Sequence, residues 1–283
     1  MKNFIQNLKT YRKSPLSLLL RIAVTLSILV TVLSLGFLIV YILAKGIPFL
    51  RPSLFSLTYN SENVSFLPSI LNTVIIVLGA LLIAGPLGIF AAIYTVEYAS
   101  RGNKIVGIVR LTTETLSGIP SIIYGLFGML FFATALHFGY SLLSGILTIS
   151  IMILPLVMRT TEEALKSVPD SYREGSYGLG AGKLRTVRSI VLPTATPGIL
   201  AGIILSVGRV VGETAALIYT AGTVADFPKG IFSSGRTLAV HMYELSREGL
   251  HTGEAYATSV ILIAVVLLIN WISNKFAHKI GKA

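Results

Sequence analysis

Long stretches without a charged residue are the feature of this sequence that most limits its fold. Residues 22–44, 64–96 and 115–158 contain no Asp, Glu, Lys or Arg. A helix that crosses a bilayer needs about 20 mostly apolar residues, so each stretch is long enough to span a membrane. Only 12% of the residues are charged, whereas soluble domains carry about 25%. The sequence therefore predicts an integral membrane protein.

The apolar stretches divide into six predicted spans of an all-α, polytopic fold. Residues 115–158 are too many for one helix, and we expect a break at residues 137–141. In the second stretch we expect a kink or an end near Gly85-Pro86, because proline lacks an amide proton. The predicted spans are 22–44, 64–96, about 115–136 and 142–158, about 196–221, and about 255–274.

The first span is expected to remain in the protein as an anchor. Its apolar region is longer than the roughly 7–15 residues of a signal peptide, and no small-residue cleavage site is evident. We therefore divide the chain into an N-terminus, residues 1–21, and a transmembrane domain, residues 22–283, whose core is about 67–275.

The positions of Lys and Arg predict the orientation, because these residues gather on cytoplasmic loops. With the N-terminus inside, inner segments hold 16 of the 23 basic residues and outer segments hold five. We therefore expect both termini in the cytoplasm. The same asymmetry accounts for the net charge of +11 without nucleic-acid binding.

The inner loop 159–195 contains the most informative motif. Pro169 and Asp170 predict a helix start, because proline fits the first turn and an acidic side chain complements the helix dipole. Gly178 and Gly180 predict its end, where a residue that tolerates positive φ is favoured. This short helix is too polar to enter the bilayer. From its shape alone, an interfacial helix on lipid headgroups is an equal alternative.

The residues of this loop resemble the EAA loop of importer-type ABC permeases, whose transmembrane domain is MetI-like. The family pattern is EAA-x3-G-x9-I-x-LP, and this chain departs from it only in having Gly and Ser where two alanines are usual. In that family the loop helix docks on a separate ATPase subunit, so the resemblance implies a cytoplasmic coupling helix. The matching positions are Glu174, Gly175, Ser176, Gly180, Ile190, Leu192 and Pro193.

We expect no enzymatic activity from this chain alone. A P-loop needs Gly-x4-Gly-Lys-Ser/Thr, and the nearest stretch, residues 178–184, lacks the first glycine and the hydroxyl. Signatures of zinc proteases and serine hydrolases are missing. The chain has no cysteine, and its histidines lack metal-ligand spacing. We expect neither metal nor cofactor in this chain, with ATP and Mg²⁺ on a partner ATPase.

Further segments, residues 92–98, 116–128 and 208–215, resemble phosphate permease subunits of the PstA type. The resemblance is good over about 67–222. It implies import of inorganic phosphate across the plasma (inner) membrane of a prokaryote. It also implies three kinds of partner: a second permease of similar fold (PstC-type), an ATPase dimer (PstB-type) and an extracytoplasmic phosphate-binding protein (PstS-type).

Arg209 and Glu213 lie near the middle of the fifth predicted span, where charge is costly and indicates function. Four residues apart on one helix, they would share a face. We expect Arg209 to meet the anion in transit, because its planar guanidinium donates two hydrogen bonds to phosphate, and Glu213 to hold and partly neutralise it. The alternative is an ion pair that only locks two helices together.

Ser117, Pro120 and Ser121 are weaker candidates for the translocation pathway. They are expected to bend the third span and expose backbone groups to the path; a role in plain helix packing is equally compatible with the sequence.

Five other polar residues receive structural interpretations. We expect Asn72 and Thr73 to hydrogen-bond another helix, Arg159 to anchor at lipid headgroups, and Glu162 and Glu163 to be solvated.

Three alternatives to phosphate import differ in class. The chain could be a permease for another oxyanion, molybdate or sulfate, in a transporter of the same kind, because selectivity resides largely in the binding protein. A role as a membrane signalling subunit would account for the loop, although it would not account for the charged residues within a span. An intramembrane enzyme is disfavoured by the missing catalytic motifs.

Overall fold

The computed structural model describes residues 15–100 and 102–280, and within these residues the regular structure is entirely helical. Most of the predicted cytoplasmic N-terminus, residues 1–14, lies outside the described residues. Five helices are long and apolar enough to cross a membrane, and one bent pair gives a sixth span. The predicted all-α, polytopic fold is confirmed. The five are α2 (Pro15–Gly46), α3 (Leu67–Ile93), α6 (Leu142–Lys166), α9 (Leu192–Val211) and α12 (Thr252–Ile280).

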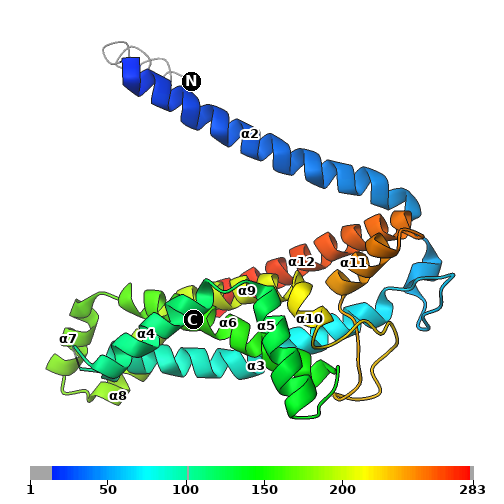
Figure 1. Ribbon diagram of the computed structural model, residues 1–283. Coiled ribbons are helices and arrows are strands. Elements are labelled where there is room, and N and C mark those ends of the chain that lie inside the picture. Colours follow the sequence, from blue (N-terminus) through cyan, green and yellow to red (C-terminus); the bar gives the residue numbers. More distant parts are fainter. Residues whose placement is uncertain (1–14, 101, 281–283) are drawn as a thin grey trace.

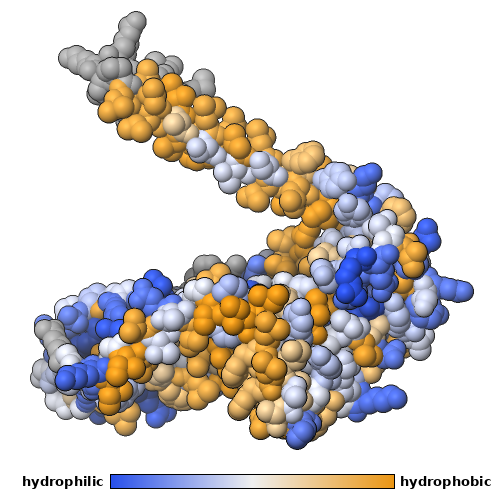
Figure 2. Space-filling model, viewed as in Figure 1, coloured by the Kyte–Doolittle hydropathy of each residue, from blue (hydrophilic) through white to orange (hydrophobic). Residues whose placement is uncertain are grey.

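The first predicted span lies within α2, which projects from the rest of the molecule (Figure 1). Its C-terminal end contacts α12, where Gly46 lies against the backbone of Tyr256. The rest of its apolar surface is exposed (Figure 2). In the body of the protein, Figure 2 shows apolar residues across the middle and hydrophilic residues at both ends. This is the distribution that a membrane-spanning body requires.

The third span is a bent pair of helices that starts earlier than predicted. The pair is α4 (Lys104–Ser117) and α5 (Ser121–Gly128), the second continuing as a π-helical segment to Ala135, and the bend between them is 102°. The bend predicted at Ser117–Ser121 is therefore confirmed, and the start predicted near residue 115 is wrong. The hydroxyl of Tyr124 donates to the carbonyl of Leu116 (2.8 Å) and fixes the two halves across the bend.

Three other boundaries differ from the predictions. The helix α3 continues through Pro86 and is extended by the π-helical segment Tyr94–Tyr98. The helix α6 runs to Lys166, beyond the predicted end at residue 158. The fifth predicted span is interrupted, because α9 ends at Val211 and the short α10 (Ala215–Ile218) follows. The break at residues 137–141 is confirmed by positive φ at His137 and Gly139.

The helices α3, α6 and α9 form the centre of the fold, with small residues at their contacts. A side chain at Gly88 would meet Val157 of α6, and one at Gly202 would meet Thr160. Small residues let helix backbones approach closely in a membrane, where packing drives association. Gly202 of α9 thus allows close contact with α6.

The polar pair Asn72 and Thr73 connects α3 to the short helix α11 (Leu238–Glu248) and to the loop just before it. Asn72 Nδ2 donates to the carbonyl of Arg236 (3.2 Å), and Thr73 Oγ1 accepts from the amide of Leu238 (2.9 Å). The predicted hydrogen bonding to another helix is confirmed for Thr73, whereas Asn72 bonds to the loop just before α11.

Candidate translocation and coupling sites

The helix predicted in the loop 159–195 is present as α7 (Asp170–Gly178), with Pro169 immediately before it. None of its residues is buried. The chain turns sharply after it at Gly180, where φ is +81°. Such a φ is accessible to glycine at little cost, which explains the glycine of the motif. A short helix α8 (Lys183–Thr186) follows and leads through a π-helical segment into α9.

Five of the seven predicted coupling residues line one hollow on the protein surface. They come from α7, from the turn after it, from the π-helical segment before α9 and from the start of α9: Gly175, Ser176, Gly180, Ile190 and Pro193. The hydroxyls of Ser176 in α7 and Thr186 in α8 lie 2.8 Å apart and connect these two helices. The other two residues are elsewhere, since Glu174 is exposed and Leu192 packs against an apolar cluster.

Large apolar side chains project from this otherwise polar loop. Leu179 is 91% exposed and Leu184 is 71% exposed. Burying such side chains against another protein is favourable, at about 25 cal/mol per Å² of apolar surface. The loop therefore has the concave shape and the apolar anchors that suit contact with a partner protein.

An ion pair missed by the sequence analysis fixes α7 to the transmembrane helices. Nη2 of Arg173 lies 2.7 Å from Oε1 of Glu97, at the end of α3, and the two side chains are 13% and 4% exposed. The guanidinium also donates to the carbonyls of Leu165 and Val168 (2.9 and 2.7 Å), at the end of α6 and just beyond it. The hydrogen bond to Glu97 raises the pKa of Arg173, so its charge is permanent. The only signal in the sequence was an acidic residue directly after an apolar span.

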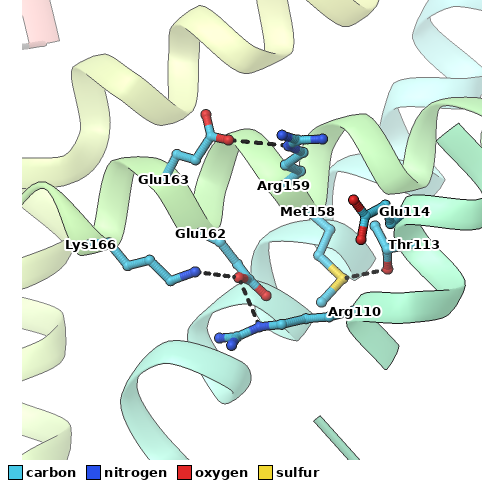
Figure 3. Close-up of a pocket in the computed structure, with 8 residues that line it drawn as sticks. All are labelled: Arg110, Thr113, Glu114, Met158, Arg159, Glu162, Glu163 and Lys166. Carbon is cyan, nitrogen blue, oxygen red and sulfur yellow. Dashed lines mark hydrogen bonds and ion pairs between the residues drawn. The ribbon is translucent and has the colours of Figure 1, made fainter. Parts of the chain in front are cut away.

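A second ionic cluster lies between α4 and α6, in a cavity of about 270 Å³ (Figure 3). Glu162 is 6% exposed, so its predicted solvation is wrong. It accepts from Lys166 Nζ (2.8 Å) and Thr95 Oγ1 (2.7 Å), and Arg110 Nε lies 3.4 Å away. The reason is that α4 and the end of α3 cover this face of α6. Glu163, on the open face, is exposed as predicted.

Arg159 pairs with Glu163 on that open face. The two side chains are 62% and 65% exposed, with Nε 3.2 Å from Oε1. An exposed pair of this kind contributes little to stability, so the anchoring role expected for Arg159 stays a prediction.

The geometry predicted for Arg209 and Glu213 is wrong. The helix ends at Val211, with Gly212 as its cap, so the two residues do not share a helix face, and no ion pair joins them within the described chain. Glycine weakens a helix by about 1 kcal/mol. The Glu213 carboxylate accepts from the amide of Ala216 (3.0 Å) and so caps α10.

The side chain of Arg209 is exposed beside this interruption and lines a hollow with Gly208 and Asn270. Arg209 lies two residues before the end of α9, and the following helix α10 packs against α5 just after the bend of the third span. Arg209 therefore lies at the junction of two broken helices, with its guanidinium accessible from outside this chain.

The bend residues lie close to the same interruption. Ser117 and Pro120 are exposed, and Ser117 Oγ donates to the carbonyl of Thr113, while Ser121 begins α5. One turn further, Gly125 lies against Ala216 of α10, the residue that Glu213 caps. The structure thus places the bend, Arg209 and Glu213 in one region of the fold, from sequence segments about 90 residues apart.

Similarity to known proteins was found at three levels. Residues 84–282 match the family described as binding-protein-dependent transport system inner membrane component. The probable ABC transporter permease protein YqgI of Bacillus subtilis is 35% identical over 229 residues, which cover 74% of this chain and 78% of the relative. The phosphate transport system permease protein PstA 2 of Mycobacterium bovis is 34% identical over 218 residues, which cover 73% of this chain and 72% of the relative.

Two solved structures share the fold. A bacterial alginate ABC transporter aligns with a TM-score of 0.69 at 16% identity, over 96% of this chain and 98% of that one. The MetNI methionine ABC transporter in an inward-facing conformation aligns with a TM-score of 0.60 at 20% identity, over 75% of this chain and 93% of that one.

Proposed function

The chain belongs to the family of inner membrane components of binding-protein-dependent transport systems, and on this premise we propose that it is the permease subunit through which inorganic phosphate enters the cytoplasm. The similarity to a phosphate transport permease over 73% of the chain carries this proposal. As an ABC permease the chain works with an ATPase and a substrate-binding protein. For phosphate these are a PstB-type ATPase dimer with ATP and Mg²⁺, a PstC-type second permease and a PstS-type binding protein.

Arg209 supports an anion as the transported species. Its guanidinium has no carboxylate partner among the described residues, and it stands where α9 is interrupted. A planar guanidinium binds a phosphate through two parallel hydrogen bonds. The Glu213 carboxylate holds the loop between α9 and α10 in place. In this proposal, and unlike the expectation from the sequence, it does not neutralise Arg209 directly. The bend at Ser117, Pro120 and Ser121 faces the same path.

The loop around α7 is the contact with the ATPase in this proposal. The ATPase surface docks into the hollow formed by the motif residues. It also covers the exposed side chains of Leu179 and Leu184. Movement of that surface displaces α7. Arg173 is bonded both to Glu97 and to the carbonyl of Leu165 near the end of α6. A displacement of α7 therefore moves α3 and α6 directly.

The orientation follows from the same assignment. If α7 meets a cytoplasmic ATPase, the basic inner segments face the cytoplasm and α11, at the opposite end of the body (Figure 1), faces the binding protein. Both termini are then cytoplasmic.

The test is uptake by proteoliposomes that contain the complete complex, with the binding protein and ATP supplied. We expect ATP-dependent uptake of labelled phosphate in preference to molybdate and sulfate. Preferred uptake of one of the other two anions would identify another oxyanion permease. A complex that transports none of the three, while its presence still controls a phosphate-responsive gene, would indicate a signalling subunit.

A further inference from the structure

A cluster of buried polar side chains lies at the end of the body opposite α7, between the start of α3 and α11 (Figure 1). Ser69, Asn72 and His241 are fully buried, and Arg236 is 5% exposed. Neither the coupling loop nor the region around Arg209 includes any of them.

Arg236 and His241 adjoin each other through Tyr59. The Arg236 guanidinium carbon lies 4.7 Å from the centre of the Tyr59 ring, and the same ring meets His241 edge-on with 6.2 Å between ring centres. Asn72 joins the group through its hydrogen bond to the carbonyl of Arg236. Tyr59 of the loop before α3, Arg236 just before α11, His241 of α11 and Asn72 of α3 therefore meet at one point, and Ser69 lies one turn before Asn72 on α3.

The polar atoms at this point have no partners within the described chain. They are Nε and Nη2 of Arg236, both ring nitrogens of His241, Oδ1 of Asn72 and Oγ of Ser69. A buried polar group without a partner is costly, and a buried charge far more so. Native proteins therefore rarely retain such a group unless something binds it.

No carboxylate neutralises Arg236 in the part of the chain that the structure describes. The nearby buried acid of α11, Glu244, pairs instead with Arg247, at 2.9 Å. The Tyr59 ring stabilises the face of the guanidinium and leaves its N–H edges without an acceptor. Because these atoms are already enclosed by this chain, a partner subunit docking on its surface does not reach them.

We propose that the Arg236 guanidinium, with His241 beside it, forms a binding site for a small inorganic anion, which acts as the buried counter-ion of Arg236. An anion accepts hydrogen bonds from Nε and Nη2 of the guanidinium at once, as a water molecule does, and in addition it cancels the charge. This site does not depend on which substrate the transporter carries.

The imidazole contributes a donor and no charge. Burial and the neighbouring Arg236 lower the pKa of His241 to about 3, against a smaller opposite effect of the Val64 backbone. The ring is therefore neutral and presents one N–H and one acceptor nitrogen. A halide uses only the donors, whereas a protonated oxyanion such as hydrogen phosphate also has a hydroxyl for Asn72 Oδ1.

The test is the thermal unfolding of the purified complex in chloride, phosphate or sulfate, each compared with gluconate at equal ionic strength and equal cation. A ligand of the folded state raises the midpoint as its concentration exceeds its dissociation constant. We expect a saturable rise in chloride or in phosphate, and the more effective anion identifies the occupant. The rise should vanish in Arg236→Met and persist in Arg51→Met, which removes an exposed arginine.

Two results would overturn the site. One is a wild-type midpoint that is the same in all four anions, which leaves water as the occupant. The other is an equal rise in wild type and Arg236→Met, which means an adventitious ion only. If Arg236→Met does not assemble, Arg236→Lys decides: it keeps the charge and loses the paired Nε and Nη2 donors, so the half-saturating concentration should rise several-fold, and an unchanged value contradicts the proposal.

Discussion

Arg173 of the helix α7 lies 2.7 Å from Glu97 at the end of α3, although 76 residues separate them in the chain. Both side chains are largely buried, and the same guanidinium holds two carbonyls at and beyond the end of α6. A short polar helix is thereby attached rigidly to two membrane-spanning helices. Such an attachment suits the coupling role that we propose for the loop, and an interfacial helix on lipid headgroups does not need it.

Glu97→Gln should uncouple ATP hydrolysis from transport. Removing one partner of a buried ion pair costs about 3–5 kcal/mol, so α7 should detach from α3 while the transmembrane body remains folded. The measurement is phosphate transported per ATP hydrolysed by the reconstituted complex, which we expect to fall about tenfold or more, in keeping with a loss above 1.4 kcal/mol.

Asp170→Asn is the matched control for this change. Asp170 also contacts Arg173, at 3.2 Å, yet its side chain is 85% exposed, and exposed pairs contribute little. The ratio of phosphate to ATP should stay near that of wild type. An equal loss in Asp170→Asn and Glu97→Gln would show that the buried pair has no special part in coupling.

Gly180→Val should weaken assembly with the ATPase. At φ +81° a β-branched side chain is strained, so the turn after α7 should change shape and the hollow beside it should be lost. Gly180→Asn should be milder, because asparagine tolerates positive φ. Co-purification of the ATPase measures the effect. Gly178→Ala is the control, since Gly178 ends α7 with open space around it; wild-type co-purification by Gly180→Val would refute a role for the turn.

Glu162→Gln should lower the thermal stability of the permease, whereas Glu163→Gln should not. Glu162 is buried and bonded to Lys166, Thr95 and Arg110, and loss of its charge leaves these partners incompletely satisfied, at a cost of about 1–3 kcal/mol. Glu163 is exposed. Unfolding midpoints of the two variants in the same detergent provide the comparison, and equal midpoints would contradict the importance of this cluster.

Single cysteines should show the orientation directly, because the chain has none of its own. Introduced at positions 60, 137 and 230, they should react with an impermeant maleimide from outside; at 3, 104, 180 and 281 they should react only after the membrane is opened. Reaction at 180 from outside would place α7 on the wrong side for an ATPase.

The spans were predictable because hydropathy is a local property of the chain, and the start of α7 was predictable because Pro169 and Asp170 act on adjacent residues. Tertiary contacts were less accessible. The burial of Glu162 depends on where α4 lies, and the pairing of Glu97 with Arg173 joins distant segments. The error at Glu213 has a local cause: Gly212 was placed inside a helix that it ends, so Arg209 and Glu213 were assigned to one helix.

Because Glu213 is not paired with Arg209, substitutions at Arg209 test its role in transport separately from the stability of an ion pair. Since Glu213 caps α10 and is not paired with Arg209, Arg209→Gln leaves no buried carboxylate unpaired, and the complex should assemble normally. Glu213→Gln keeps an oxygen acceptor for the Ala216 amide, so it should retain the fold and much of the transport, whereas Glu213→Leu removes the cap at a cost of about 0.5–2 kcal/mol.

The most direct measurement is phosphate uptake, normalised to membrane-inserted complex, for Arg209→Gln, Arg209→Lys and wild type. If Arg209 meets the anion in transit, Arg209→Gln should assemble and transport almost nothing. Arg209→Lys, which keeps the charge and loses the two-pronged geometry, should be partly active. Uptake by Arg209→Gln close to that of wild type, at equal complex abundance, would contradict the assignment of Arg209 to the phosphate pathway.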